Sequence, residues 1–104
     1  MDVGDLDVKI CEGSEAVHVA LAGEIDLATA PQLDATLQEI PRTKKIRIDL
    51  TLVTFLDAHA LALFARADRD GHAGSGRVEL VGVGPLARKL LTITGLDSLI
   101  STPG

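Results

Sequence analysis

The sequence has one cysteine, two phenylalanines, and neither tryptophan nor tyrosine among its 104 residues. With Cys11 alone, an internal disulfide is excluded, and no Cys-x-x-Cys or Cys/His spacing indicates a metal site. The shortage of aromatic rings argues against binding of single-stranded nucleic acid, which uses such rings as stacking platforms. The net charge of −5, without any run of Lys or Arg, argues against binding of duplexes.

Long hydrophobic runs are also missing from the sequence. No apolar stretch approaches the roughly 18 residues that a membrane-spanning helix needs. Residues 1–5 are acidic and carry no apolar core of a signal peptide. We therefore expect a cytoplasmic protein that binds no membrane, organised as a single domain over 1–104. Hydrophobic residues make up 46% of the chain, which is enough for an aliphatic core.

The motifs of common enzyme classes are absent as well. No G-x-S-x-G motif is present, and the run Gly82 to Gly84 lacks the third glycine of a dinucleotide-binding loop. The glycine-rich stretch 71–76 lacks the Lys-Ser/Thr pair of a phosphate-binding loop. Asp49 and Asp57 form only a lone carboxylate pair, and no nucleophile lies beside a base. We expect no enzymatic activity, no cofactor and no metal.

What the sequence does contain is an alternation of strand and helix patterns. Alternating apolar residues predict strands, the first two joined as a hairpin, over 7–11, 17–21, 46–50, 78–80 and a short 99–100. Apolar residues at helical spacing predict helices over 30–40, 58–67 and 85–93. Together these elements predict an α/β fold with a mixed sheet of four to five strands and three or four helices, mainly on one face.

Residues suited to helix ends support these helices. Thr29 and Asp57 are expected to cap the first and second helices, while Gly71 and Gly95 are expected to end the second and third. The spacing places Leu33, Leu37 and Ile40 on one apolar face of the first helix, and Leu86, Leu90 and Ile93 on one apolar face of the third.

Three segments form a specific pattern when taken together. They span Leu21–Leu33, with L-A-G-E-I-D-L-A-T-A-P, then Ile48–Leu61, with F-L-D-A-H-A-L, and finally Gly82–Leu96. In order and spacing these segments resemble the STAS domain and, within it, the bacterial anti-sigma factor antagonists. The resemblance covers essentially the whole chain, and it implies an STAS-like fold that agrees with the order of strands and helices.

The resemblance also implies a mechanism. In such antagonists the loop after the third strand reads Asp-Ser-Ser-Gly, and an anti-sigma factor that is a serine kinase phosphorylates the first serine. Unphosphorylated antagonist binds the anti-sigma factor and frees the sigma factor, whereas phosphorylation blocks that binding. Here Asp57 is kept, Ala58 occupies the phosphoacceptor position, and His59 and Ala60 replace the second serine and the glycine. The phosphorylation switch is therefore expected to be absent.

Docking to the anti-sigma factor is expected to remain, since much of the matching frame is apolar. The residues expected at this partner-binding surface are Asp26, Thr29, Phe55, Leu56, Asp57, Ala58, His59, Ala60 and Leu61. For Asp26 and Thr29, plain helix capping is an equally good interpretation.

Several alternatives stay open at the level of sequence. His59, Thr51 and Thr54 are possible substitute modification sites. A deliberate serine-to-alanine change is disfavoured, because His59 and Ala60 also depart from the family pattern. In place of an antagonist, the chain could be a small-ligand or nucleotide-sensing module, or a scaffold that associates with itself. The oligomeric state is left between a monomer and a weak homodimer.

Overall fold

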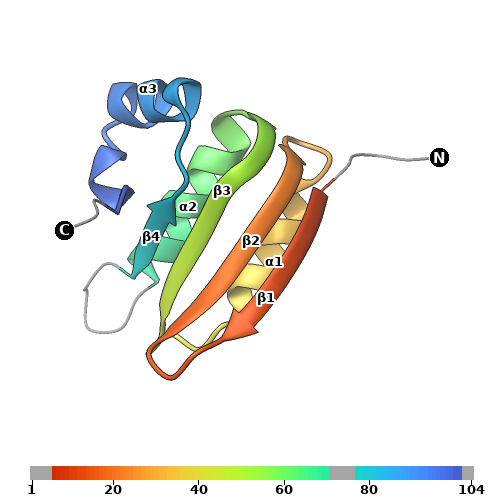
Figure 1. Ribbon diagram of the computed structural model, residues 1–104, viewed down its shortest axis with the longest axis vertical. Helices are drawn as coiled ribbons and strands as arrows, with labels where there is room; N and C mark the ends of the chain where they lie inside the picture. Colours follow the sequence, from red (N-terminus) through yellow and green to blue (C-terminus); the bar gives the residue numbers. More distant parts are fainter. Residues whose placement is uncertain (1–5, 71–76, 102–104) are drawn as a thin grey trace.

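A mixed four-stranded sheet organises the chain in the computed structural model, which describes residues 6–70 and 77–101 (Figure 1). The strands lie in the order β1 (Leu6–Glu12), β2 (Ala16–Ile25), β3 (Lys45–Leu56) and β4 (Val78–Val81). β1 and β2 form the predicted antiparallel hairpin, whereas β2, β3 and β4 run parallel. The helices are α1 (Ala30–Gln38), α2 (Ala58–Arg69) and α3 (Pro85–Ile93), followed by the 3-10 turn η2 (Asp97–Leu99).

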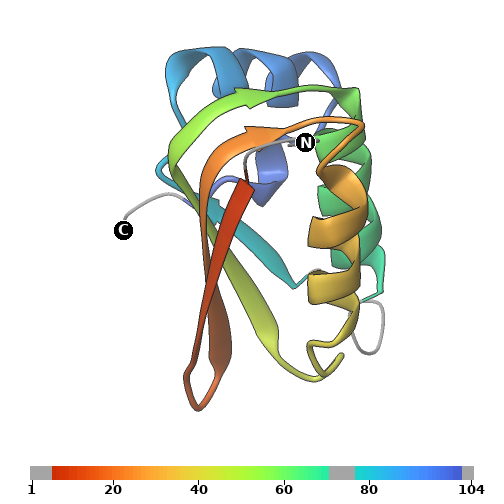
Figure 2. The ribbon, with the colours of Figure 1, turned by 90° about the vertical axis from the view of Figure 1, so that its right-hand side faces the viewer.

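The helices α1 and α2 cover one face of the sheet, and the other face is open to solvent (Figure 2). β2 shows how the sequence specifies this arrangement, because alternate residues of a strand point to opposite faces. Val17 and Val19 are buried beneath the helices, whereas His18 and Ala20 are exposed. The predicted α/β class and the predicted alternation along the second strand are therefore confirmed.

The core lies between the sheet and the two helices, and it is almost entirely aliphatic, as the composition indicates. Phe64 of α2, one of the two aromatic residues, is fully buried at its centre. From α1 the core receives the predicted face, although that helix ends at Gln38 and Ile40 is buried from the turn that follows. The largest fully buried side chains are Phe64, Leu21, Ile25, Leu33, Ile46, Ile48, Leu80, Leu91, Val17 and Val19.

The prediction for the last strand is wrong. Leu99 belongs to the 3-10 turn η2, and Ile100 makes one isolated parallel bridge to Leu80. The amide of Ser101 also donates to the carbonyl of Leu80 at 2.9 Å, and among the described residues the pairing extends no further. The predicted end of α2 at Gly71 falls outside the described residues.

The apolar face predicted for α3 lies mostly at the surface. Leu86 and Ile93 are 68% and 70% exposed, while Leu91 is completely buried and Leu90 half-buried. α3 crosses one end of the molecule instead of lying flat on the sheet, so only a narrow side of it meets the core (Figures 1 and 2). Its apolar stripe is consequently left at the surface.

The predicted end of α3 is confirmed. Gly95 has a φ of 77°, in the left-handed region that favours glycine. The amide of Leu96 donates to the carbonyl of Leu91 at 2.7 Å, and the amide of Gly95 donates to that of Thr92 at 3.2 Å. This pair of bonds satisfies carbonyls that the end of a helix would otherwise leave free.

An ion pair joins β3 to β4 on the open face of the sheet. Arg47 Nε and Nη2 donate to Glu79 Oε1 at 3.1 and 2.9 Å, and Lys45 Nζ lies 3.5 Å from Glu79 Oε2. The hydrogen bonds from Arg47 lower the pKa of Glu79, against a smaller opposing effect of burial.

We expect this ion pair to contribute stability that disappears in acid. Since the folded-state pKa of Glu79 lies below its ordinary value, the contribution is full above the unfolded-state pKa and is lost as the pH falls through the folded-state value. Partial exposure limits it to about 1 kcal/mol. Urea unfolding of wild type and Glu79→Gln, from about pH 7 down to about pH 2, measures it. A difference between the two proteins that stays constant over that range contradicts the assignment.

Candidate functional site

The junction between β3 and α2 carries the loop that the sequence singled out. Asp57 adopts an extended backbone conformation and caps α2, because its Oδ1 accepts from the amide of His59 at 2.8 Å. The amide of Asp57 itself donates to the carbonyl of Ile25 at 3.2 Å, which ties this junction to the end of β2. The predicted capping role of Asp57 is confirmed, and the carboxylate lies at the positive end of the helix dipole.

Ala58 is the first residue of α2 and is exposed. The neighbouring His59 is also exposed, and its Nδ1 lies 3.2 Å from Asp57 Oδ1. A side chain at position 58 therefore faces solvent and any docked partner, next to one carboxylate and one imidazole.

The loop between β2 and α1 is held by a reciprocal pair. Asp26 Oδ1 accepts from the amides of Ala28 and Thr29 at 3.0 and 3.1 Å, and the Asp26 amide donates to Thr29 Oγ1 at 3.0 Å. Thr29 Oγ1 donates to the carbonyl of Glu24 at 2.8 Å. The predicted side-chain cap by Thr29 is therefore wrong, because its hydroxyl turns back to β2 and makes no cap bond to α1.

Four residues of the predicted docking surface are buried, so the prediction that they face a partner is corrected. Thr29 is 3% exposed because it holds its own loop, and the other three lie on the inner sides of β3 and α2: Leu56, Ala60 and Leu61. Helical geometry explains the last two, since positions 60 and 61 turn away from the exposed positions 58 and 59. Of the predicted apolar residues, Phe55 and Ala58 remain exposed.

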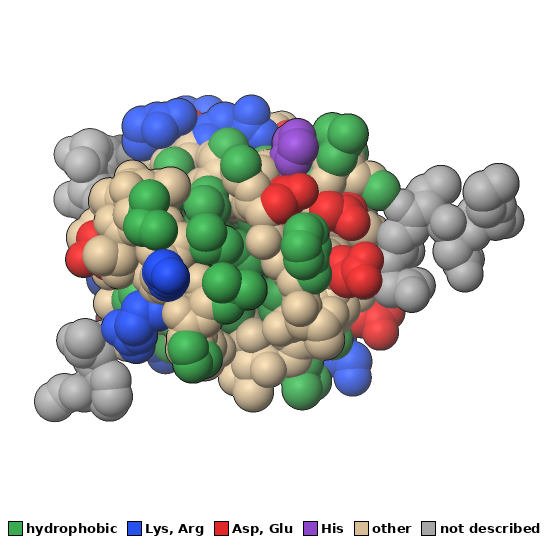
Figure 3. Space-filling view, turned by 90° about the horizontal axis from the view of Figure 1, so that it is seen from above, with side chains coloured by type: hydrophobic (Ala, Val, Ile, Leu, Met, Phe, Trp, Pro, Cys, Tyr) green, Lys and Arg blue, Asp and Glu red, His purple; other side chains and the backbone are tan. Residues whose placement is uncertain are grey.

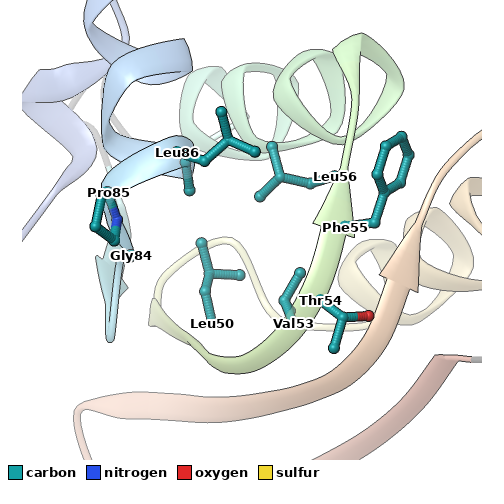
Figure 4. A pocket seen from close by; sticks show the side chains of 9 residues that line it. Leu50, Val53, Thr54, Phe55, Leu56, Gly84, Pro85 and Leu86 are labelled. Atoms are coloured by element: carbon teal, nitrogen blue, oxygen red, sulfur yellow. The ribbon is translucent and has the colours of Figure 1, made fainter.

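A hollow that we call the β3–α3 groove lies on one side of the Asp57–His59 loop. It has a volume of about 150 Å³ and is lined mainly by Leu50, Val53, Phe55, Leu56, Pro85 and Leu86. Leu86 of α3 faces Leu50 and Leu56 of β3 across it (Figure 4). Seen from above, hydrophobic side chains gather in the middle of this end of the molecule (Figure 3).

A second apolar surface, the α1–α2 face, lies on the other side of the same loop. It is a shallow hollow of about 340 Å³, formed by Leu27, Ala30, Pro31, Ala62 and Leu63 beside His59. An ion pair between Asp34 Oδ1 and Arg66 Nη2, 2.6 Å apart, closes one edge. Sequence reasoning missed Leu27 and Leu86 as surface residues. An apolar residue inside the polar turn after a strand was the available signal for Leu27.

The two threonines considered as substitute modification sites both lie on β3 and are exposed. Thr51 Oγ1 donates to Asp49 Oδ1 at 2.6 Å, and this bond is the main cause that lowers the pKa of Asp49. Thr54 Oγ1 donates to the carbonyl of Gly23 at 3.2 Å. Their role as modification sites stays a prediction.

Fold and site define a small α/β docking domain whose exposed loop and two apolar hollows lie at one end of the sheet. The family model described as "Mlab, STAS domain" matches residues 9–101, and the chain belongs to the STAS domain family. Across the two described parts, 6–70 and 77–101, no helix is long and apolar enough to cross a membrane.

Relatives with assigned names support this membership. The anti-sigma-B factor antagonist of Listeria monocytogenes is 32% identical to this chain, and the match covers 92% of this chain and 87% of that relative. The protein of the same name from Staphylococcus aureus is 26% identical, over 92% of this chain and 91% of that relative.

Solved structures agree with the fold. The crystal structure of an anti-sigma factor antagonist from Mycobacterium paratuberculosis has a TM-score of 0.76 at 28% identity, covering 92% of this chain and 83% of that one. The anti-sigma factor antagonist SpoIIAA in its unphosphorylated form has a TM-score of 0.77, with 94% and 89% coverage. At 21% identity, that likeness shows the fold alone.

Proposed function

We propose that this chain is an anti-sigma factor antagonist that binds its partner without control by phosphorylation at position 58. The observation that carries the proposal is Ala58, an exposed methyl group at the first position of α2, in a loop whose capping carboxylate is intact. The named relatives support the antagonist role. The resemblance of the loop sequence implies that position 58 is the phosphoacceptor position.

The partner in this proposal is an anti-sigma factor of the serine-kinase type. It docks over Ala58, His59 and the α1–α2 face, where Leu27 is 68% exposed beside the shallow hollow. An exposed apolar surface next to a polar loop is typical of a docking site. In this proposal the chain acts by binding and has no catalytic role of its own. It works in the cytoplasm, where sigma-dependent transcription takes place.

The charge balance at the loop explains why a phosphoryl group there would act as a switch. It would add roughly two negative charges beside the Asp57 carboxylate, at a surface that a partner has to desolvate. Because Ala58 has no hydroxyl, the chain stays in the chemical state that binds. Its control then rests on its amount or on another partner.

Intact-mass analysis after incubation with the anti-sigma kinase and ATP tests the chemistry directly. We expect no added phosphoryl group on the wild type and one on Ala58→Ser, with the hydroxyl restored at the same exposed position. A phosphoryl group mapped to residues 57–60 of the wild type overturns the proposal. Thr51→Val and Thr54→Val assign any phosphoryl group found on β3.

A charged side chain at position 58 should mimic the blocked state. We expect Ala58→Glu to weaken binding of the anti-sigma factor by roughly 10-fold to 100-fold, because a rim of like charge or an unpaired buried carboxylate opposes docking. The change should not harm folding, since an acidic residue suits the first turn of a helix.

The matched control for this binding experiment is Ala20→Glu, since Ala20 is exposed on the open face of the sheet, away from α2. Isothermal titration of the anti-sigma factor with the three proteins measures the effect. If Ala58→Glu and Ala20→Glu bind the anti-sigma factor with equal affinity, the loop is not part of the docking surface.

The small-ligand alternative has less support. Ligand pockets usually enclose about 300–1,000 Å³ and bury most of the ligand. The β3–α3 groove offers about 150 Å³, and the hollow of the α1–α2 face, at about 340 Å³, is shallow and open.

A further inference from the structure

We propose that the β3–α3 groove binds a second copy of this chain around a two-fold axis. The interface would use the end of β3 and the outer side of α3. It would share Phe55 with the docking surface expected from the sequence, but it would not use Ala58, His59 or the α1–α2 face, over which the anti-sigma factor is proposed to dock.

This surface exposes several large apolar side chains that no other described part of the chain covers. Leu86 and Ile93 of α3 are 68% and 70% exposed, and Phe55 at the end of β3 is 49% exposed. Leu86 and Phe55 both line the β3–α3 groove. Burial of about 25 cal/mol per Å² of such surface favours a partner that covers the groove and the stripe on α3 together.

The charges on the two sides of the groove are opposite. Glu24 pairs with Phe55 in the parallel ladder of β2 and β3, so the β3 side carries an exposed acidic side chain. Arg88 and Lys89 follow Leu86 on α3 and make the other side basic. From above, most acidic side chains lie to the right of the apolar middle, and basic ones lie to its left and along the upper edge (Figure 3).

These charges are available for a partner. Glu24, Arg88 and Lys89 are all exposed. Among the described residues, none of the three takes part in an ion pair, unlike Asp34 with Arg66 or Glu79 with Arg47.

An acidic side and a basic side around an apolar middle are self-complementary under two-fold symmetry. In such an interface each contact between two different residues occurs twice, once in each direction. The axis would bring Leu86 of one copy against Phe55 of the other, and Lys89 of one copy against Glu24 of the other. A surface of one sign would repel its own copy, whereas this arrangement attracts it. The partner at this surface is therefore a second copy of the chain.

Sedimentation velocity on the wild type and on two charge-reversed variants tests the proposal. The acidic variant carries Arg88→Glu and Lys89→Glu, and the basic variant carries Glu24→Lys. We expect the wild type to dimerise with rising concentration, and each variant alone to dimerise at least about 10-fold more weakly because like charges then meet twice. An equimolar mixture should regain the wild-type association, because both contacts then join opposite charges.

Two further variants complete the design. Leu86→Asp should lose association, whereas Lys9→Glu, a reversal on the exposed side of β1, should keep it. The proposal is overturned by a wild type that stays monomeric over the whole range, by a dimer that all variants form equally, or by a mixture that stays monomeric. Failure to capture an anti-sigma factor would overturn the proposed function and leave these measurements unaffected.

Discussion

Replacing Arg77 with methionine is expected to lower the free energy of unfolding by roughly 3–5 kcal/mol. The side chain is 6% exposed, and its guanidinium donates to main-chain carbonyls in the last turn of α2 and in the turn that follows α1. Nε donates to Ala67 at 3.1 Å, and Nη1 to Pro41 at 2.8 Å, with longer contacts to Ile40 and Lys44. Methionine fills a similar volume but leaves these carbonyls without their donor, at about 1–3 kcal/mol each where they are buried.

The charge on Arg77 survives this environment. Burial is the main effect on its pKa and lowers it, while the charge of Asp70 acts in the opposite direction. A guanidinium nevertheless keeps its proton in proteins, so all of its donors stay available to the carbonyls at neutral pH.

Urea unfolding compares Arg77→Met with Arg42→Met, an exposed arginine nearby whose removal should cost less than about 0.5 kcal/mol. Arg77→Lys should fall between the wild type and Arg77→Met, because an ammonium keeps the charge but cannot span both helix ends. Similar losses for Arg77→Met and Arg42→Met would show that the carbonyl bonds do not stabilise the fold.

Gly82→Ala is expected to cost roughly 2–4 kcal/mol, the second largest effect. Gly82 has a φ of 66°, which a residue with a side chain rarely adopts. A Cβ atom built there would overlap Thr51 Oγ1 and lie 2.6 Å from Asp49 Oδ1. Neither group can move away easily, because Asp49 Oδ1 accepts from the amide and the hydroxyl of Thr51 at 2.9 and 2.6 Å.

Two other glycines separate the two causes of this loss. Gly95 has a positive φ of 77° but open space around it, so Gly95→Ala should cost only the backbone strain, about 1 kcal/mol. Gly84 has neither restriction, with a φ of −76° and nothing within 4 Å of an added Cβ, so its alanine variant should cost less than about 1 kcal/mol. Thermal and urea unfolding should show the largest loss of stability for Gly82→Ala, a smaller one for Gly95→Ala and the smallest for Gly84→Ala. Equal losses for Gly82→Ala and Gly95→Ala would contradict the predicted overlap.

Features that depend on neighbours along the chain were predictable from the sequence. The alternation at Val17 and Val19 predicts the buried face of β2, because a strand repeats every two residues whatever lies above it. Asp57 was predictable as the cap of α2 and Gly95 as the end of α3, since both are settled by bonds or dihedral angles within a few residues.

Features that depend on distant parts of the chain were not predictable in this way. The stripe of Leu86 and Ile93 predicts an apolar face of α3 correctly, but periodicity does not tell whether another element covers that face. Thr29 is a good capping residue, yet its hydroxyl bonds to the carbonyl of Glu24, which the turn after β2 brings within reach. The burial of Ala60 and Leu61 follows from the direction in which α2 leaves the sheet.

By itself, the sequence determined that position 58 has no hydroxyl, that the chain has the strand and helix order of its family, and that Asp57 caps α2. Covalent chemistry and short-range hydrogen bonds suffice for each of these. Only the tertiary structure decided which apolar residues remain at the surface. Exposure is a property of the packed molecule, because a side chain is buried by elements from elsewhere in the sequence, and α3 leaves Leu86 and Phe55 uncovered at opposite sides of one groove.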